Sequence, residues 1–160
     1  MNTDPHTSGA ALLRRARLRV TSPRLAVLEM LAEYPHADVD AITAGARQCL
    51  GTLSKQAVYD ILRVLVDAGL ARRIEPAGSP ARYETRVTDN HHHVVCRRCH
   101  AIADVDCAVG SAPCLKPSNT HDYLIDEAEV THWGLCPSCQ DHVMSSSLAP
   151  HTDLENTHDR

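Results

Sequence analysis

The sequence predicts an α+β protein, in which an N-terminal winged helix-turn-helix is followed by a small α/β dimerisation domain with a structural zinc site. Three observations support this fold class. Apolar residues recur at helical spacing over residues 10–69, and two strand-like segments joined by a turn follow them. Two Cys-x-x-Cys pairs then stand at residues 96–99 and 136–139. A chain of 160 residues can hold one domain, or two small ones, with a real core.

Four helices are expected in the first half of the chain. Their expected ranges are residues 10–19, 21–34, 39–50 and 54–69. The second helix begins with a hydroxyl cap at Thr21 and has Pro23 in its first turn. Gly51 ends the third helix, Ser54 caps the fourth, and Gly69 terminates that fourth helix.

Two short strands, at residues 71–75 and 82–87, flank a Pro- and Gly-rich turn at residues 76–80. Helices followed by such a hairpin form the winged helix-turn-helix pattern, in which the helix from Ser54 enters the DNA major groove. The arginines of the wing are then expected to approach phosphate: Arg72, Arg73, Arg82 and Arg86. The alternative is a solvated helical bundle whose arginines keep it soluble, and the hairpin disfavours that alternative.

Charge is divided unevenly along the chain, whose formal net charge is −4. Residues 1–86 carry 12 Lys and Arg against 9 Asp and Glu, whereas residues 87–160 carry 4 against 11. The basic half can therefore meet phosphate while the acidic half faces away from it or holds cations. No apolar run reaches membrane-spanning length, and residues 1–9 lack the apolar core of a signal peptide, so we expect a cytoplasmic protein.

After a hinge near residues 87–90 the chain changes character. Short strands of a small sheet are expected at residues 94–95, 102–105 and 130–135, with a loop at 116–120. The expected division is a winged-helix DNA-binding domain at 10–87, a metal-binding dimerisation domain at 91–142 and a disordered tail at 143–160. Three short strands are too few for a stable lone domain, so zinc and a second copy of the chain are both expected to support the sheet.

Four cysteines form the two pairs, Cys96-Arg97-Arg98-Cys99 and Cys136-Pro137-Ser138-Cys139. Each Cys-x-x-Cys turn aims two thiolates at one point, and two such turns complete a tetrahedral zinc site that holds structure and performs no chemistry. The alternative is two disulfides or a redox dithiol, which an odd total of seven cysteines in a reducing compartment disfavours. Cys49 is expected in the core. Cys107 and Cys114 are either small buried side chains or candidate redox thiols that form a disulfide under peroxide.

Three consecutive histidines, His91, His92 and His93, precede the first cysteine pair. On a strand, His91 and His93 point to one face and His92 points to the other. A mixed nitrogen and oxygen ligand set suits Fe(II), Mn(II) or Zn(II) better than copper(I). The run therefore predicts a second, exchangeable metal site, and the alternative is a polar run on the surface.

From about residue 14 to residue 140, the chain resembles the ferric uptake regulator family. The residues that carry the resemblance are 18–24 (LRVTSPR), 56–62 (QAVYDIL), 91–99 (HHHVVCRRC) and 136–139 (CPSC). Residues 82–84, 104–107 and 127–130 are similar to the actinobacterial branch linked to catalase or catalase-peroxidase control. The resemblance implies a dimeric DNA-binding repressor whose operator affinity depends on a regulatory metal. In the peroxide-sensing members, iron at that site reacts with hydrogen peroxide and the protein leaves DNA.

The resemblance also assigns roles to residues of this chain. It implies structural Zn²⁺ on the four paired cysteines: Cys96, Cys99, Cys136 and Cys139. It implies a regulatory site for Fe²⁺ or Mn²⁺ that contains Glu84, His91, His93 and Asp104 and is completed by one histidine of the DNA-binding domain. Many relatives place that histidine at the position of Tyr34. Either His36 completes the site instead, which we favour, or Tyr34 weakens it.

A further regulatory site of some relatives is matched only in part. His92 and His132 could contribute to it, but Asn90 and Ala128 stand where those relatives have histidines. The remaining histidines of this half are expected to be ordinary surface residues: His100 and His121.

For DNA, the same resemblance makes Tyr59 the base-contacting tyrosine, whose ring can touch a thymine methyl group. At the start of the recognition helix, backbone N–H groups meet phosphate at Ser54, Lys55 and Gln56. Arg19 matches the position from which relatives reach into the minor groove. Asp60 departs from the Arg or Asn of relatives, so it either reads cytosine N4 or rejects some operators.

Together with these features, the resemblance implies a metal-dependent, peroxide-responsive repressor. It is expected to bind operator DNA as a homodimer and to control its own gene and a catalase or catalase-peroxidase gene. The alternative within the family is a regulator of iron, zinc or nickel uptake without peroxide sensing. A metalloenzyme is disfavoured because the sequence shows no separate acid/base motif. No membrane partner and no small-molecule substrate other than peroxide as a signal are expected.

Overall fold

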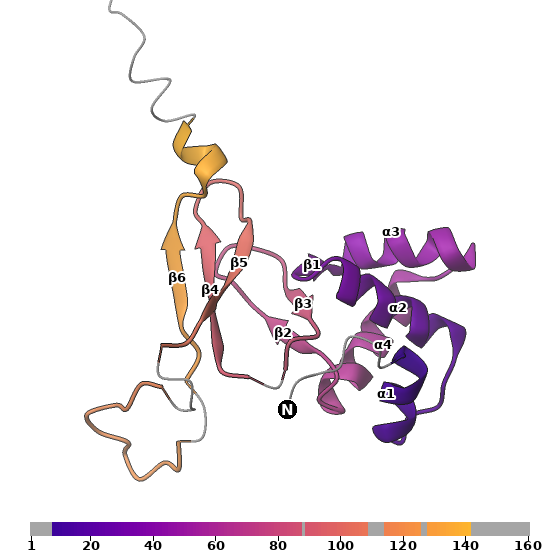
Figure 1. Ribbon diagram of the computed structural model, residues 1–160, viewed down its shortest axis with the longest axis horizontal. Coiled ribbons are helices and arrows are strands. Elements are labelled where there is room, and N and C mark those ends of the chain that lie inside the picture. Colours follow the sequence, from indigo (N-terminus) through magenta and orange to yellow (C-terminus); the bar gives the residue numbers. More distant parts are fainter. Residues whose placement is uncertain (1–7, 88, 109–113, 126–127, 142–160) are drawn as a thin grey trace, which may run out of the picture.

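The computed structural model describes residues 8–87, 89–108, 114–125 and 128–141. Helices gather at one end of the molecule, a three-stranded sheet lies at the other, and a hairpin stands between them (Figure 1). This arrangement agrees with the predicted α+β class. The tail predicted at residues 143–160 lies outside the described residues. Within the part of the chain that is described, no helix is long and apolar enough to span a membrane.

Four helices form the first half: α1 (Gly9–Arg15), α2 (Ser22–Glu33), α3 (Val39–Leu50) and α4 (Lys55–Asp67). The prediction that the first helix runs to residue 19 was wrong. Arg17 adopts a left-handed conformation with φ of 58°, and the N–H of Leu18 returns to the carbonyl of Leu13 at 2.8 Å. This closing geometry ends α1 early. Arg19 therefore lies in the connection to α2 and not on a helix.

The predicted helix caps were partly right. Ser54 accepts a hydrogen bond from the backbone N–H of Ala57 at 3.1 Å, which fixes the start of α4. Thr21 occupies the cap position of α2, but its hydroxyl makes no capping bond there, contrary to expectation. At the other ends, Gly51 and Gly69 have φ of 78° and 64°, which favours glycine at both stops.

The core of the helical part is formed by facing sides of α2, α3 and α4, and its most enclosed side chains include Leu31, Ile42 and Leu62. Cys49 does not belong to it, because this cysteine is exposed. Residues 47–49 are all exposed, so the last turn of α3 extends beyond the helices that pack on it. The prediction of a core cysteine was therefore wrong, since helical spacing alone does not reveal where a packing partner ends.

Three short strands form the wing: β1 (Ala37–Asp38), β2 (Arg72–Ile74) and β3 (Arg82–Glu84), in the antiparallel order β1-β3-β2. β2 and β3 are shorter than predicted, and β1 was not predicted because two residues carry no alternation. β1 pairs Ala37 with Tyr83, and the N–H of His36 donates to the carbonyl of Tyr83 at 2.9 Å. The connection between α2 and α3 is thereby attached to the wing.

The second sheet contains β4 (His91–Cys96), β5 (Ile102–Asp106) and β6 (Thr131–Gly134), in the order β5-β4-β6. β4 is central, antiparallel to β5 and parallel to β6. It is longer than the predicted strand at residues 94–95, because all three histidines take part in the ladder. Five of its six residues are buried, and the three histidines are among them. The histidines therefore stand at fixed register positions.

Candidate metal centres

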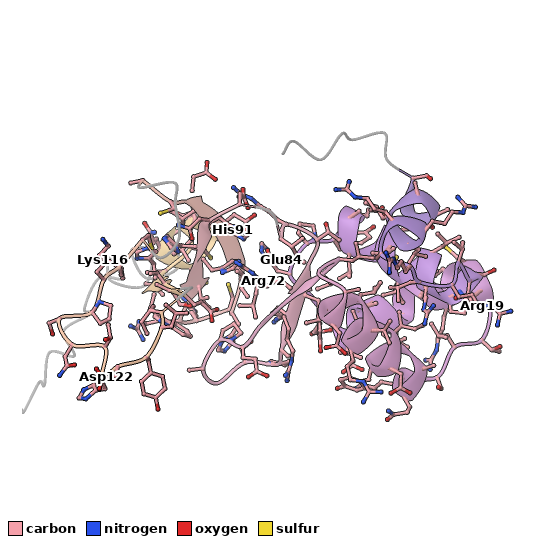
Figure 2. The ribbon with its side chains drawn as sticks, turned by 90° about the horizontal axis from the view of Figure 1, so that it is seen from below. Arg19, Arg72, Glu84, His91, Lys116 and Asp122 are labelled. Atoms are coloured by element: carbon pink, nitrogen blue, oxygen red, sulfur yellow. The ribbon has the colours of Figure 1, made fainter. Side chains whose placement is uncertain are left out.

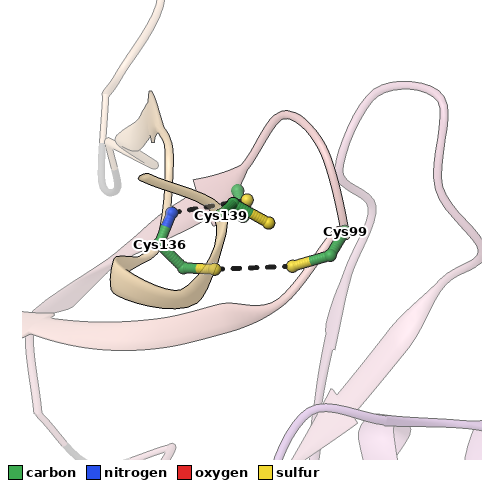
Figure 3. A group of neighbouring side chains, drawn as sticks. Cys99, Cys136 and Cys139 are labelled. Carbon is green, nitrogen blue, oxygen red and sulfur yellow. Dashed lines mark hydrogen bonds between the residues drawn. The ribbon is translucent and has the colours of Figure 1, made fainter. Parts of the chain in front are cut away.

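The four paired cysteines converge on one point. Their sulfur atoms all lie within 4.8 Å of one another. The first pair begins at the last residue of β4, and the second pair begins a short helical turn after β6 (Figure 3). The Sγ atoms of Cys99 and Cys136 are 3.6 Å apart, and the backbone N–H of Cys136 donates to Cys96 Sγ at 3.4 Å. Two turns that lie about 40 residues apart in the sequence thus supply the four sulfur ligands of one site.

The electrostatics of this cysteine tetrad favour a cation at its centre. Backbone N–H groups of Cys136 and Cys99 lower the pKa of Cys96 to about 5. Burial, together with hydrogen bonding to the neighbouring sulfurs, raises the pKa of Cys139 to about 12. One thiolate is therefore stable within the group, whereas four adjacent thiolates need a divalent cation among them. The S4 donor set fits structural zinc, as the cysteine spacing predicts.

A second cluster of ligand atoms lies where the helical part meets the second sheet. It comprises His36, Glu84, His93 and Asp104, whose ligand atoms all lie within 4.8 Å of one another. The Nε2 atom of His36 is 2.7 Å from Asp104 Oδ1 and 3.2 Å from Glu84 Oε2. The Nε2 atom of His93 is 3.4 Å from the same Glu84 oxygen. His36 precedes β1, Glu84 ends β3, and His93 and Asp104 face each other across β4 and β5.

The structure places His36, and not Tyr34, in this mixed cluster. The side chain of Tyr34 is 52% exposed, whereas that of His36 is 10% exposed. His36 adopts a left-handed conformation with φ of 63°, and its N–H bonds to the wing strand β3. Pairing of the wing therefore decides which of the two neighbouring side chains turns inward. That His36 is a metal ligand remains a prediction.

His91 lies at the margin of the mixed cluster, near Glu84 as Figure 2 shows. Its Nε2 atom is 3.1 Å from Glu84 Oε1 and 4.0 Å from Asp104 Oδ1. Its Nδ1 atom is 3.0 Å from a carboxylate oxygen of Asp89. A proton on Nδ1 that is donated to Asp89 would leave the Nε2 lone pair directed at the site. Sequence reasoning missed Asp89, and its only signal was an acidic residue two positions before a candidate ligand.

Arg86 does not play the role expected of a wing arginine. Its guanidinium donates to Asp89 at 2.7 Å, to Asp106 at 2.6 Å and to Asp104 at 3.3 Å. These contacts raise the pKa of Arg86, with the hydrogen bond to Asp89 as the largest cause. The guanidinium is therefore engaged by three carboxylates, those of Asp89, Asp104 and Asp106. The Arg86 side chain, which follows the wing in sequence, thus pairs with carboxylates of the acidic half of the chain.

The imidazoles of the mixed cluster favour the ionised form of Glu84. Burial alone would raise the pKa of Glu84, but hydrogen bonds with His36 and His93 lower it to about 2. Burial alone would lower the pKa of His36, but the hydrogen bond with Glu84 and the charge of Asp104 raise it above its usual value. A divalent cation would supply a counter-charge to the two carboxylates of the cluster. Imidazole and carboxylate donors fit Fe²⁺ or Mn²⁺.

On the opposite face of β4, His92 lies with Cys107 and Cys114. The Sγ atom of Cys114 is 3.2 Å from His92 Nε2. His132 is exposed, and its ring centre is 6.4 Å from that of His92, so it stands beside this group and outside it. The two predicted surface histidines differ: His121 is exposed, but His100 is half-buried and was therefore misjudged.

The residues predicted to face DNA are all exposed: Arg19, Ser54, Lys55, Gln56 and Tyr59. A shallow hollow of about 660 Å³ separates the connection after α1 from the start of α4, and Arg19 and Asp60 both line it. Lys55 is paired with Asp40 at 2.6 Å. Tyr59, 44% exposed, projects from the second turn of α4. Each of these residues is thus accessible on the helical part.

Comparison with known proteins gives consistent matches. The ferric uptake regulator family matches residues 15–129. The transcriptional regulator FurA of Mycobacterium tuberculosis is 60% identical over 130 residues, which are 81% of this chain and 88% of that protein. The peroxide-responsive repressor PerR of Staphylococcus aureus is 28% identical over 137 residues, or 82% of this chain and 88% of that repressor.

Among solved structures, the fold is similar to that of the ferric uptake regulator Fur of Helicobacter pylori, whose structure is described as revealing three functional metal binding sites. The TM-score is 0.61 at 21% sequence identity, and the alignment covers 80% of this chain and 86% of that chain. This likeness concerns the fold alone.

Proposed function

Because the chain belongs to the ferric uptake regulator family, a family of transcriptional regulators, we propose that it is a metal-dependent, peroxide-responsive repressor that binds operator DNA as a cytoplasmic homodimer. The observation that carries this proposal is the mixed cluster, in which His36 of the helical part lies 2.7 Å from Asp104 of the second sheet. A cation held there would join the two parts of the molecule. The similarity to a peroxide-responsive repressor supports the nature of the signal.

The metal acts on DNA affinity through the relative position of the two parts. His36 and Glu84 come from the helical part and its wing, whereas His93 and Asp104 come from the sheet. A cation that needs ligands from both sides binds tightly only when the parts are close, which is also the arrangement that fits an operator. A ligand must favour one arrangement by several kcal/mol, about 5.5 for a near-complete switch, to change occupancy decisively.

The cysteine tetrad and the mixed cluster have separate duties in this proposal. Zn²⁺ on the tetrad fastens the ends of β4 and β6 and supports the sheet. Fe²⁺ or Mn²⁺ occupies the regulatory site of His36, Glu84, His91, His93 and Asp104. Iron held there would supply redox chemistry with hydrogen peroxide that manganese would not. Peroxide would then add one oxygen to the ring of His91 or its partner and leave as water, and the loss of that nitrogen ligand would separate the two parts of the chain.

An exposed apolar surface on the second half supports the homodimer. Tyr123 and Leu124 are 75% and 97% exposed, and Val105 on the edge strand β5 and Leu135 after β6 are 36% and 40% exposed. Exposed apolar side chains around a small three-stranded sheet are the kind of surface that a second chain can cover. A second copy would also place a second α4 for the other half of a symmetric operator.

The function is tested by measuring binding to DNA upstream of the protein's own gene and of a catalase or catalase-peroxidase gene, at fixed salt. The zinc-loaded protein is titrated anaerobically with Mn²⁺ or Fe²⁺, and peroxide is then added. Both metals are expected to raise affinity, and peroxide is expected to abolish binding only in the iron form. Mass spectrometry of that form should show one added oxygen on a peptide that contains a regulatory histidine. Metal-independent binding to these sites would contradict the proposal.

The alternative proposal is a regulator of metal uptake, which the family's own name favours. It shares the zinc tetrad, the mixed cluster and the DNA surface. It differs in one outcome, because the metal raises operator affinity but peroxide leaves the iron form bound. An oxygen added to Cys107 or Cys114 in place of a histidine would move the peroxide response to those thiols.

Replacing Tyr59 with alanine is expected to weaken specific operator binding by about 1–3 kcal/mol and to leave binding to random DNA nearly unchanged. The reason is that an exposed ring on α4 can contact base edges but contributes little to phosphate binding. Fluorescence anisotropy with operator and random duplexes measures the ratio. Tyr34→Ala removes a similarly exposed tyrosine outside α4 and serves as the matched control. An unchanged operator-to-random ratio in Tyr59→Ala would remove this residue from base readout.

A further inference from the structure

His92 is a buried imidazole that neither the zinc tetrad nor the mixed cluster uses. Only 8% of the residue is exposed. Its Nε2 atom lies 3.2 Å from the Sγ atom of Cys114, and Cys107 completes a group whose ligand atoms are all within 4.8 Å of one another. Both cysteines are half-buried. A buried nitrogen aimed at two thiols is an unusual arrangement for side chains that only fill space.

The strand register explains why these residues meet. β4 pairs His91 with Asp106 and His93 with Asp104, and these pairs face the mixed cluster. His92 pairs with Val105, so the two point to the other face of the sheet. Cys107 follows Val105 by two positions and therefore continues on the face of His92. Cys114, seven residues farther along the chain, returns to the same place.

The donor set of this group differs from both other centres. The tetrad offers four sulfurs and the mixed cluster offers nitrogen and oxygen, whereas this group offers one imidazole nitrogen and two sulfurs. Thiolate and imidazole together select borderline and soft divalent cations such as Zn²⁺ over Mg²⁺ or Mn²⁺. Three protein ligands leave one position of a tetrahedron for water or an incoming ligand, which makes the ion exchangeable.

We propose that His92, Cys107 and Cys114 form a third metal site, which binds an exchangeable Zn²⁺-type cation on the face of β4 opposite the regulatory cluster. The cation replaces the thiol protons, so each bound ion releases protons to solvent. It fastens the chain at Cys114 to the central strand β4. The proposal does not depend on DNA binding or on histidine oxidation, because none of its three residues belongs to the tetrad, the mixed cluster or the exposed surface of α4.

The competing role of the two cysteines is a disulfide. A disulfide needs an oxidant that takes two electrons from the thiols, and it leaves His92 without a function. A metal site needs reduced thiols and uses the imidazole. A metal site therefore requires reduced thiols and the imidazole of His92, whereas a disulfide requires oxidised sulfurs and no imidazole. One experiment separates these two roles.

The test uses full-length protein that is kept reduced and carries zinc on the tetrad. Co²⁺ is the probe, since it binds more weakly than Zn²⁺ to a given ligand set and therefore leaves the tetrad zinc in place. Cobalt bound by nitrogen and oxygen lacks the near-ultraviolet charge-transfer band that a thiolate ligand gives. The proposal expects one cobalt per chain with this band, and loss of the band when one equivalent of Zn²⁺ is added.

Variants identify the source of the band. Cys107→Ser, Cys114→Ser and His92→Ala are each expected to lose or strongly weaken it while zinc content and thermal unfolding stay unchanged. Cys49→Ser removes an exposed cysteine elsewhere and is expected to keep the band. His36→Ala disables the regulatory cluster and is also expected to keep it, which separates this proposal from the proposed function.

Three results overturn the proposal. They are a reduced wild-type protein without the band, a band that survives both Cys107→Ser and Cys114→Ser, and thiolate binding that does not respond to His92→Ala. A mass decrease of two hydrogens in air, combined with no cobalt–thiolate band after reduction, would assign the pair of cysteines to a disulfide instead.

Discussion

Replacing Cys139 with serine is expected to remove the structural zinc and to unfold or strongly destabilise the β4–β6 sheet. Cys139 is buried, and its sulfur is one of four within 4.8 Å. Apparent binding free energies of structural zinc are about 10–16 kcal/mol in small domains, and this energy is largely folding energy. Loss of most of it exceeds the stability of a three-stranded sheet with few large side chains.

Three measurements check this expectation. The zinc content of the tetrad, measured by elemental analysis, should fall from one ion per chain to nearly none. The melting temperature of the sheet should decrease, or its thermal transition should vanish. The dimer should dissociate. Cys49→Ser is the matched control, because Cys49 is exposed at the end of α3 and is not part of the tetrad. Retention of zinc and an unchanged transition in Cys139→Ser would show that the tetrad does not stabilise the sheet.

Replacing His36 with alanine is expected to lower affinity for Mn²⁺ by more than about 10-fold and to abolish the metal-dependent rise in operator affinity. His36 approaches Asp104 and Glu84 from the helical part, so its loss leaves a metal held by the wing and the sheet alone. The zinc content and the binding to random DNA are expected to stay as they are, since neither the tetrad nor the α4 surface is touched.

The measurement is a paired titration, by calorimetry for Mn²⁺ and by anisotropy for the operator with and without metal. His121→Ala removes an exposed histidine and controls for the loss of an imidazole as such. Tyr34→Phe removes the competing phenol oxygen and is expected to change nothing. If Tyr34→Phe abolishes the metal response while His36→Ala preserves it, the assignment of the ligand is reversed.

Arg86 and Asp89 contact two of the residues proposed as regulatory ligands without belonging to that set. Arg86 donates to Asp104 and Asp89, and Asp89 in turn lies 3.0 Å from Nδ1 of His91. A guanidinium that bridges the two carboxylates restrains the orientation of both. Such outer contacts orient metal ligands and affect metal affinity substantially. The segment between β3 and β4, which contains Arg86 and Asp89, therefore also positions residues of the mixed cluster.

Local patterns predicted the helices well, because helix formation depends on neighbouring residues. Helical spacing placed α3 at Val39–Leu50 as found, and the hydroxyl of Ser54 indicated the start of α4. The early end of α1 was not visible in the sequence, since it depends on a left-handed Arg17 that no glycine announces. Cys49 shows the same limit for packing, because spacing does not tell how far a neighbouring helix reaches.

The cysteine tetrad was predictable because Cys-x-x-Cys is itself a local geometry that presents two sulfurs to one point. Most of the mixed cluster was named only through the family resemblance, because its ligands come from separate elements. The inward turn of His36 requires the pairing of β1 with β3, which two residues of sequence do not predict. The prediction that Arg86 approaches phosphate failed for the same reason, because two of its acidic partners are 18 and 20 positions away in the sequence.

The sequence by itself determined helices α2, α3 and α4, the zinc tetrad and the alternation that sends His91 and His93 to one face and His92 to the other. These depend on short-range backbone geometry, which is fixed within a few residues. Only the tertiary structure decided that His36 faces Asp104, that Arg86 serves the acidic residues, and that Cys107 and Cys114 meet His92. Each of these contacts depends on strand register or on chain return over many residues, which side-chain identity alone does not specify.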